Sequence, residues 1–184
     1  MRKSIIAILM TFCLSIMTYA QTPRDRATEL KEQAQSSLNQ KDYIKARYLF
    51  KKAYEAFATR ENYPQAIECG VQANALYVRE NFYKEGFELC RDMDQLIWAG
   101  EQNQKKVFYD LRFLVNKERL QMYTALKNPA QAKTQLNKLE ETANLAKNDS
   151  LTEVLLYTKA NYYYTFNQNA QGDACFRKLI NQYK

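Results

Sequence analysis

Small residues recur along this chain at intervals of about 40 residues, and this internal repeat is the strongest constraint on its fold. Ala46, Gly86, Ala132 and Gly172 are separated by 40, 46 and 40 residues, and each lies near the start of a segment with helical hydrophobic spacing. Two antiparallel helices approach closely only where a small side chain leaves room, because a larger one would wedge them apart. The repeat therefore predicts a series of helical hairpins, each built around one close contact.

Glycine and proline are scarce, so the chain has few of the residues that form turns between β-strands. The chain has four Gly and three Pro among 184 residues, whereas average usage would give roughly 13 and 9. Apolar residues recur instead at spacings of three and four, as on one face of a helix. We therefore predict an all-α fold with helices at 25–39, 43–60, 63–80, 83–99, 104–127, 129–147, 151–167 and 170–183.

Capping residues mark several of the predicted helix ends. Asn62 and Asn128 each stand just before a first turn that contains proline, which predicts that both act as N-caps. Ser150 with Glu153 matches a capping box and predicts a helix that begins at residue 151. Gly100 follows an apolar run and is predicted to end the preceding helix.

The first unit has the clearest family signature. Ala34 and Ser37 lie on one predicted helix, and the segment 42–53, with Ala46, Phe50 and Ala53, resembles the second half of a tetratricopeptide repeat. The resemblance extends over units at about 27–60, 67–100, 113–147 and 151–184. It implies that residues 21–184 form a right-handed superhelical solenoid of about four antiparallel helix hairpins, with the first helix of each hairpin on a concave face.

The chain departs from this family in several places. Its repeat periods exceed the family's roughly 34 residues. Asn74 and Leu120 stand where the family has a small residue, and Pro129 replaces an aromatic one. These differences predict longer helices or extra turns between hairpins.

The first twenty residues have the composition of a secretory signal peptide. Arg2 and Lys3 precede an apolar run of 13 residues from Ile5 to Met17, and Ala20 ends a small-x-small cleavage site. This run is shorter than the roughly 20 residues that a membrane-spanning helix needs. We therefore expect residues 1–20 to be removed and the remainder to be exported to the bacterial periplasm or extracellular space, without membrane insertion.

The chain contains no histidine, which removes most familiar catalytic arrangements. Ser-His-Asp triads, Cys-His pairs and histidine metal sites are impossible, and no glycine-rich phosphate loop, CxxC or HExxH motif is present. The formal net charge is +7, but lysine and arginine alternate with acidic and amide residues instead of forming a basic stripe. We therefore expect a non-enzymatic protein with no cofactor, no metal and no nucleic-acid partner.

Three cysteines remain after the predicted cleavage, and an odd number cannot form a closed disulfide framework. Cys69, Cys90 and Cys175 are interpreted as free buried thiols that pack as small apolar residues. Export would permit one bridge, between Cys69 and Cys90, which the repeat register places on facing helices of one hairpin.

Tyrosine is the most suggestive residue type, with fourteen in the chain. Most tyrosines fall at packing positions of the repeat, and the family resemblance implies that others line the concave face. A mixture of apolar, amide and basic side chains there suits a protein or peptide partner. The implied partner-binding residues are Lys31, Gln35, Val78, Arg79, Lys117, Gln121, Tyr157, Asn161 and Tyr164. An alternative for Tyr157 and Tyr164 is packing against a following repeat.

Two functions remain open from the sequence. The first is an exported, non-catalytic scaffold that binds a protein or peptide through its concave face. The second is the N-terminal sensory portion of a membrane-anchored bacterial histidine kinase or transcriptional regulator whose other parts lie beyond Lys184. A signal peptide followed by irregular repeats resembles the sensory half of such regulators. Solenoids usually need a polar cap, and Tyr162, Phe166 and Leu179 are predicted to leave an apolar face uncovered. The partner and the oligomeric state are not predicted.

Overall fold

The computed structural model describes residues 25–181, and all regular secondary structure in that range is α-helical. None of the described helices is long and apolar enough to cross a membrane. The predicted signal peptide, residues 1–20, lies outside the described residues. The helices are α2 (Arg26–Asn39), α3 (Tyr43–Ala58), α4 (Tyr63–Arg79), α5 (Tyr83–Gln104), α6 (Tyr109–Ala125), α7 (Pro129–Ala146), α8 (Asp149–Thr165) and α9 (Asn169–Asn181).

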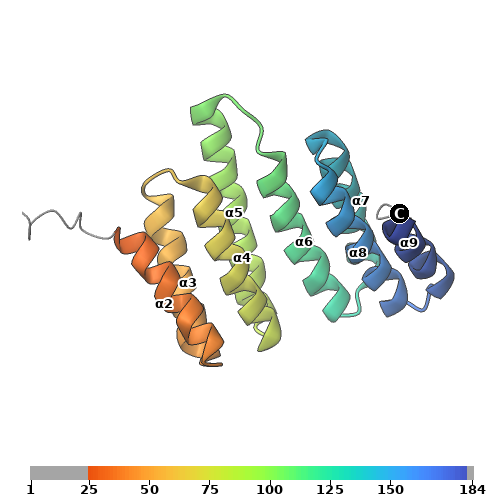
Figure 1. The fold of residues 1–184 in the computed structure, drawn as a ribbon, viewed down its shortest axis with the longest axis horizontal. Coiled ribbons are helices and arrows are strands. Elements are labelled where there is room, and N and C mark those ends of the chain that lie inside the picture. The colour runs from red at the N-terminus through yellow and green to blue at the C-terminus, as the bar shows by residue number, and fades with distance from the viewer. Residues whose placement is uncertain (1–24, 182–184) are drawn as a thin grey trace, which may run out of the picture.

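The helices pair into hairpins that follow one another along the long axis of the molecule (Figure 1). Helix α2 packs on α3, α4 on α5, α6 on α7 and α8 on α9. Each hairpin also contacts the next, through α3 with α4, α5 with α6 and α7 with α8. The first helices meet as well, since α4 contacts α6 and α6 contacts α8. The predicted all-α class is thus confirmed for the described residues.

The turns between helices use left-handed residues that are not glycine. A positive φ occurs in the described chain at Lys41, Glu61, Asn81, Lys105, Lys127, Lys147 and Asn167. At five of these turns the backbone N–H that follows bonds back to a carbonyl of the preceding helix, as Asp42 does to Ser37 at 2.9 Å and Asn128 to Tyr123 at 3.0 Å. This pattern is the Schellman motif, and it stops each helix without the usual glycine. The scarcity of glycine is therefore compatible with sharp turns.

Two of the predicted caps are confirmed and one is wrong. Asn62 accepts from the backbone N–H of Gln65, and Asn128 accepts from that of Gln131. Helix α8 begins earlier than predicted, because Asn148 is the N-cap and accepts from the N–H of Ser150 at 3.0 Å. The capping-box pattern at residues 150–153 therefore lies inside the first turn.

The prediction that Gly100 ends a helix is also wrong. Helix α5 continues to Gln104 and ends at Lys105, which has a φ of 50°. Gly100 is buried within the helix, where a Cβ atom would lie 2.8 Å from the Phe108 ring and 2.9 Å from the Tyr63 ring. The glycine is needed for the close approach of two aromatic rings, and this contact involves residues that are distant in sequence.

Replacing Gly100 by alanine is expected to destabilise the protein by up to about 2 kcal/mol. Alanine favours a helix over glycine by about 1 kcal/mol, but overpacking costs about 1–3 kcal/mol. Thermal unfolding followed by circular dichroism measures the difference. Combining Gly100→Ala with Phe108→Leu should recover part of the loss, because a branched aliphatic side chain can move away from the new methyl group. A Gly100→Ala protein more stable than the parent would contradict this assignment.

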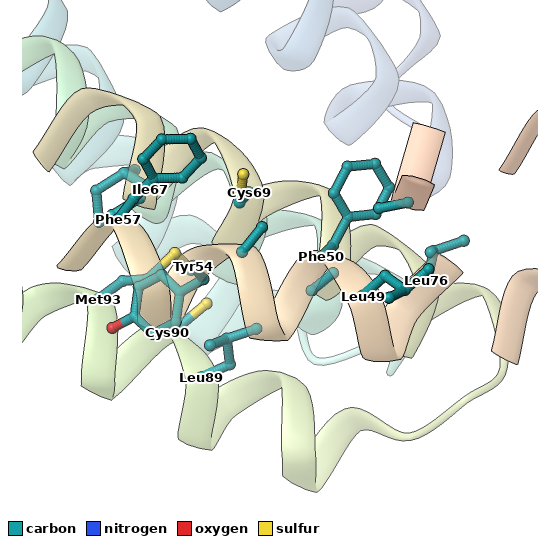
Figure 2. Close-up of a cluster of buried hydrophobic side chains, with 14 of the residues drawn as sticks. Leu49, Phe50, Tyr54, Phe57, Ile67, Cys69, Leu76, Leu89, Cys90 and Met93 are labelled. Carbon is teal, nitrogen blue, oxygen red and sulfur yellow. The ribbon is translucent and has the colours of Figure 1, made fainter. Parts of the chain in front are cut away.

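The core consists of two clusters of buried side chains. The first lies among α2 to α6, and Figure 2 shows its centre, where Leu49, Phe50, Tyr54 and Phe57 of α3 meet residues of α4 and α5. The second lies among α6, α7 and α8. Helix α6 contributes to both, with Val115 and Met122 in the first and Phe113 and Leu120 in the second. This helix therefore connects the two halves of the molecule.

The structure contains no bridge between Cys69 and Cys90, so that prediction is not borne out. Both residues and Cys175 are buried free thiols among the described residues. Figure 2 shows Cys69 and Cys90 on two different helices, with their sulfur atoms apart from each other in the first cluster. Packed helix axes lie about 8–10 Å apart, which is wider than a disulfide can span unless both side chains point toward each other.

The prediction of an uncovered apolar face on the fourth hairpin is wrong for Tyr162, one of its three residues. Tyr162 is only 5% exposed and belongs to the second cluster, so it faces back toward the preceding hairpin. Its ring packs on Phe166 and Tyr163, with centroid distances of 5.0 and 5.3 Å. Phe166 and Leu179 are half-buried. Tyr162 therefore does not contribute to an uncovered apolar face, and the choice between the two functions stays open.

Candidate partner-binding site

A cleft with a volume of about 380 Å³ lies between α6 and α8, the first helices of the third and fourth hairpins. Each helix contributes residues one turn apart, so that one face of α6 lies opposite one face of α8. We call this the α6–α8 cleft, and it is lined by Lys117, Leu120, Gln121, Thr124, Ala125, Lys127, Val154, Tyr157, Thr158, Asn161, Tyr162 and Thr165.

Four of the predicted partner-binding residues meet in this cleft. Lys117 and Gln121 come from α6, and Tyr157 and Asn161 come from α8. Tyr157 is 54% exposed, while one edge of its ring packs on Phe176 of α9 with a centroid distance of 6.1 Å. The tyrosine is thus held on one side by the hairpin and open to the cleft on the other.

The first and second hairpins use their predicted site residues for contacts within the protein. Lys31 of α2 forms an ion pair with Glu68 of α4 at 2.7 Å and donates to Gln65 at 2.8 Å. The guanidinium of Arg79 lies over the Tyr43 ring, 3.8 Å from its centroid. These residues therefore join neighbouring helices.

The remaining predicted residues do not line the cleft either. Gln35 donates to Asn39 on the same helix, and Val78 is half-buried against the first core cluster. Tyr164 stacks on Phe176 with a centroid distance of 5.9 Å, and its hydroxyl bonds to Asp173. Tyr164 thus joins α8 to α9, which differs from both alternatives that the sequence left open.

A buried carboxylate beside the cleft residue Lys117 was missed by sequence reasoning. Glu118 is 1% exposed, and its Oε1 lies 3.1 Å from the Lys117 ammonium. Its other oxygen accepts from the side-chain amide of Asn74 at 3.2 Å. A buried charge is tolerated when such partners surround it. The unusual Asn74, which replaces a small residue of the repeat, was the only sequence signal for this network.

Gly86 explains how Asn74 fits at this position. A Cβ atom at Gly86 would lie 3.0 Å from Oδ1 of Asn74 and 2.8 Å from the Met122 sulfur. The small residue that the repeat places on the facing helix, Gly86, therefore leaves room for the larger Asn74 side chain. The network positions the Lys117 side chain at the edge of the α6–α8 cleft.

The cleft offers binding groups, and its charged side chains are Lys117 and Lys127. Val154 and Tyr157 supply apolar surface, and the amides of Gln121 and Asn161 can each donate and accept hydrogen bonds. No cluster of potential metal ligands occurs among the described residues.

Comparisons with protein-family models, curated proteins and solved structures found no match. The function is therefore inferred from the site itself.

Proposed function

We propose that this chain is an exported, non-catalytic scaffold of the tetratricopeptide type that binds an extended peptide segment of a partner protein in the α6–α8 cleft. The small residues of the 40-residue repeat support the solenoid part of this proposal, because Ala46, Gly86, Ala132 and Gly172 are all buried. The contacts between successive first helices, α4 with α6 and α6 with α8, are those that a concave face of this kind requires.

The convergence of four predicted residues in one cleft is the observation that carries the binding proposal. Lys117 and Gln121 are about 40 residues from Tyr157 and Asn161, and only packing of α6 beside α8 brings them together. A volume of about 380 Å³ is within the range of ligand pockets. Tyrosine is also among the residues that most often anchor interfaces.

An extended peptide fits the chemistry of the cleft better than a folded surface. The backbone N–H and C=O groups of an extended peptide are unpaired. The side-chain amides of Gln121 and Asn161 are exposed on opposite walls of the cleft and can form hydrogen bonds with these groups. An apolar side chain of the peptide would pack against Val154 and the open face of Tyr157. In this arrangement about one peptide side chain would be buried, and the peptide backbone would form hydrogen bonds with Gln121 on one side and Asn161 on the other.

Selection from a phage-displayed peptide library tests the proposal, because it samples many peptide sequences at once. An enriched peptide, labelled with a fluorophore, is expected to bind the parent protein and to bind the Tyr157→Ala/Asn161→Ala variant at least tenfold more weakly, as measured by fluorescence polarisation. Tyr48→Ala is the control, because Tyr48 is similarly exposed but lies on α3. Helicity should be the same in all three proteins. Failure to enrich any peptide, or equal affinity in the double variant, would contradict the proposal.

A further inference from the structure

A second groove, with a volume of about 490 Å³, lies on a different face of α6, between α5 and α7. Helix α6 forms its floor, and α5 and α7 form its walls, since both pack on α6. We call this the α5–α7 groove, and it is lined by Asp94, Ile97, Trp98, Tyr109, Arg112, Asn116, Arg119, Lys138, Glu141, Thr142 and Leu145. It shares no lining residue with the α6–α8 cleft.

The floor of this groove is a row of paired donors and acceptors. Arg112 donates through Nε to Glu101 at 2.7 Å and forms an ion pair with the same carboxylate. Seven residues further along α6, Arg119 pairs with Asp94 and donates to the carbonyl of Cys90 at 2.9 Å. These contacts fix both guanidinium groups in place before any ligand arrives.

Asn116 continues the row between the two arginines. Its side-chain amide donates to the hydroxyl of Thr142 on α7 at 3.4 Å. Arg112, Asn116 and Arg119 lie three and four residues apart, so their side chains share one face of the helix. Along this face, α6 therefore supplies donors, and α5 and α7 supply an acceptor beside each of them. Each donor and each acceptor can form further hydrogen bonds.

Trp98 stands on the α5 wall of the groove and is 62% exposed. It is the only tryptophan in the chain, and the fold does not bury it. Leu145, on the α7 wall, is also exposed, and Tyr109 lies at the end of the floor. The groove thus combines an open aromatic platform with a polar floor.

The charges around the groove are balanced. Arg112, Arg119 and Lys138 are matched by Asp94, Glu141 and the Glu101 carboxylate behind the floor. Hydrogen bonding from Arg112 holds the pKa of the Glu101 carboxyl below its ordinary value, so this acid is ionised at neutral pH. A groove without net charge does not favour phosphate-rich or strongly acidic ligands.

We propose that the α5–α7 groove binds a neutral oligosaccharide, with one pyranose ring stacked on Trp98 and its hydroxyl groups bonded to the paired side chains of the floor. A pyranose has an apolar face of C–H groups, which packs well on an aromatic ring. Its hydroxyls each donate and accept hydrogen bonds, which suits the donors of α6 and the acceptors that α5 and α7 place beside them. This inference does not rest on the peptide-binding proposal, because the two sites share no lining residue.

The single tryptophan provides a direct test. The chain is titrated with cellohexaose, maltohexaose, xylohexaose, mannohexaose and chitohexaose while Trp98 fluorescence is recorded, and a printed glycan array extends the panel. At least one neutral glycan is expected to produce a saturable change in emission. Isothermal titration with that glycan should show at least tenfold weaker binding for Trp98→Ala, partial retention for Trp98→Phe, and unchanged binding for Tyr48→Ala.

The outcomes separate this proposal from protein docking at the same surface. No saturable response to any of the glycans, or equal glycan binding by the parent and Trp98→Ala proteins, would overturn it. A blue shift produced only by an amphipathic helical peptide would also overturn it and identify the groove as a helix-binding surface. Because Trp98 is exposed, its replacement is expected to leave the helical content unchanged, so loss of glycan binding would not reflect unfolding.

Discussion

Raising the pH from 9 to 11 is expected to lower the free energy of unfolding by about 4 kcal/mol, because two buried thiols ionise readily only in the unfolded chain. Burial raises the pKa of Cys69 to about 11 and that of Cys90 to about 12, from an ordinary value of 9.0. Ionisation of these two thiols therefore does not lower the free energy of unfolding well below pH 9. The free energy of unfolding falls as the pH rises from 9 toward the thiol pKa values of the folded protein. Each thiol lowers the free energy of unfolding by at most about 1.4 kcal/mol per pH unit in this interval.

Urea unfolding at pH 7, 9, 10 and 11 under reducing conditions measures this effect. A Cys69→Ala/Cys90→Ala protein should show a much smaller decrease in stability between pH 9 and 11, although its stability at pH 7 will be lower because small cavities are created. Burial also raises the pKa of Tyr54 to about 12, so some alkaline loss should persist above pH 10 in the variant. An unchanged pH dependence in the double variant would refute the role of the thiols.

Replacing Phe113 by alanine is expected to lower the free energy of unfolding by about 3–5 kcal/mol, because its side chain is fully buried and leaves a large cavity. Phe113 belongs to the second core cluster, which holds α7 and α8 against α6. The first cluster, among α2 to α6, does not contain it. We therefore expect the C-terminal hairpins to open at lower denaturant concentration than the N-terminal ones, so that unfolding is no longer two-state.

Hydrogen exchange with mass spectrometry distinguishes this local loss from uniform destabilisation. In Phe113→Ala, amides of α7 and α8 should exchange faster than in the parent, whereas those of α3 and α4 should change little. Leu126→Ala is a suitable control, because Leu126 immediately follows α6 but is exposed. Equal acceleration throughout the chain would show that the two clusters unfold as one unit.

Local sequence signals predicted the helix ends correctly where those ends depend only on residues that are close in the sequence. Asn62 and Asn128 cap helices as expected, since a side chain that bonds to a backbone N–H three residues later needs no distant partner. The same reasoning failed at Gly100 and Ser150. Position 100 needs a glycine because the rings of Phe108 and Tyr63 pack against it. Helix α8 is capped by Asn148, which lies two residues before Ser150.

The candidate sites were predictable to different degrees. Lys117, Gln121, Tyr157 and Asn161 could be placed on one surface, because the repeat register assigns equivalent positions to successive hairpins. Glu118 gave no such signal, since its burial depends on Asn74 and Lys117 around it. The α5–α7 groove was missed altogether, because its walls come from helices whose separation depends on how each packs on α6.

The sequence by itself determined that the described chain is a row of helical hairpins with small residues at their contacts. Hydrophobic spacing, caps and small residues act within a few residues of the backbone, so they are readable without a structure. Only the tertiary structure decided which helix faces meet, where Tyr162 and Tyr164 point, and which side chains stay open to a ligand. Those outcomes depend on the mutual fit of side chains that are far apart in the sequence, as in the pairing of Asn74 with Gly86 and Glu118.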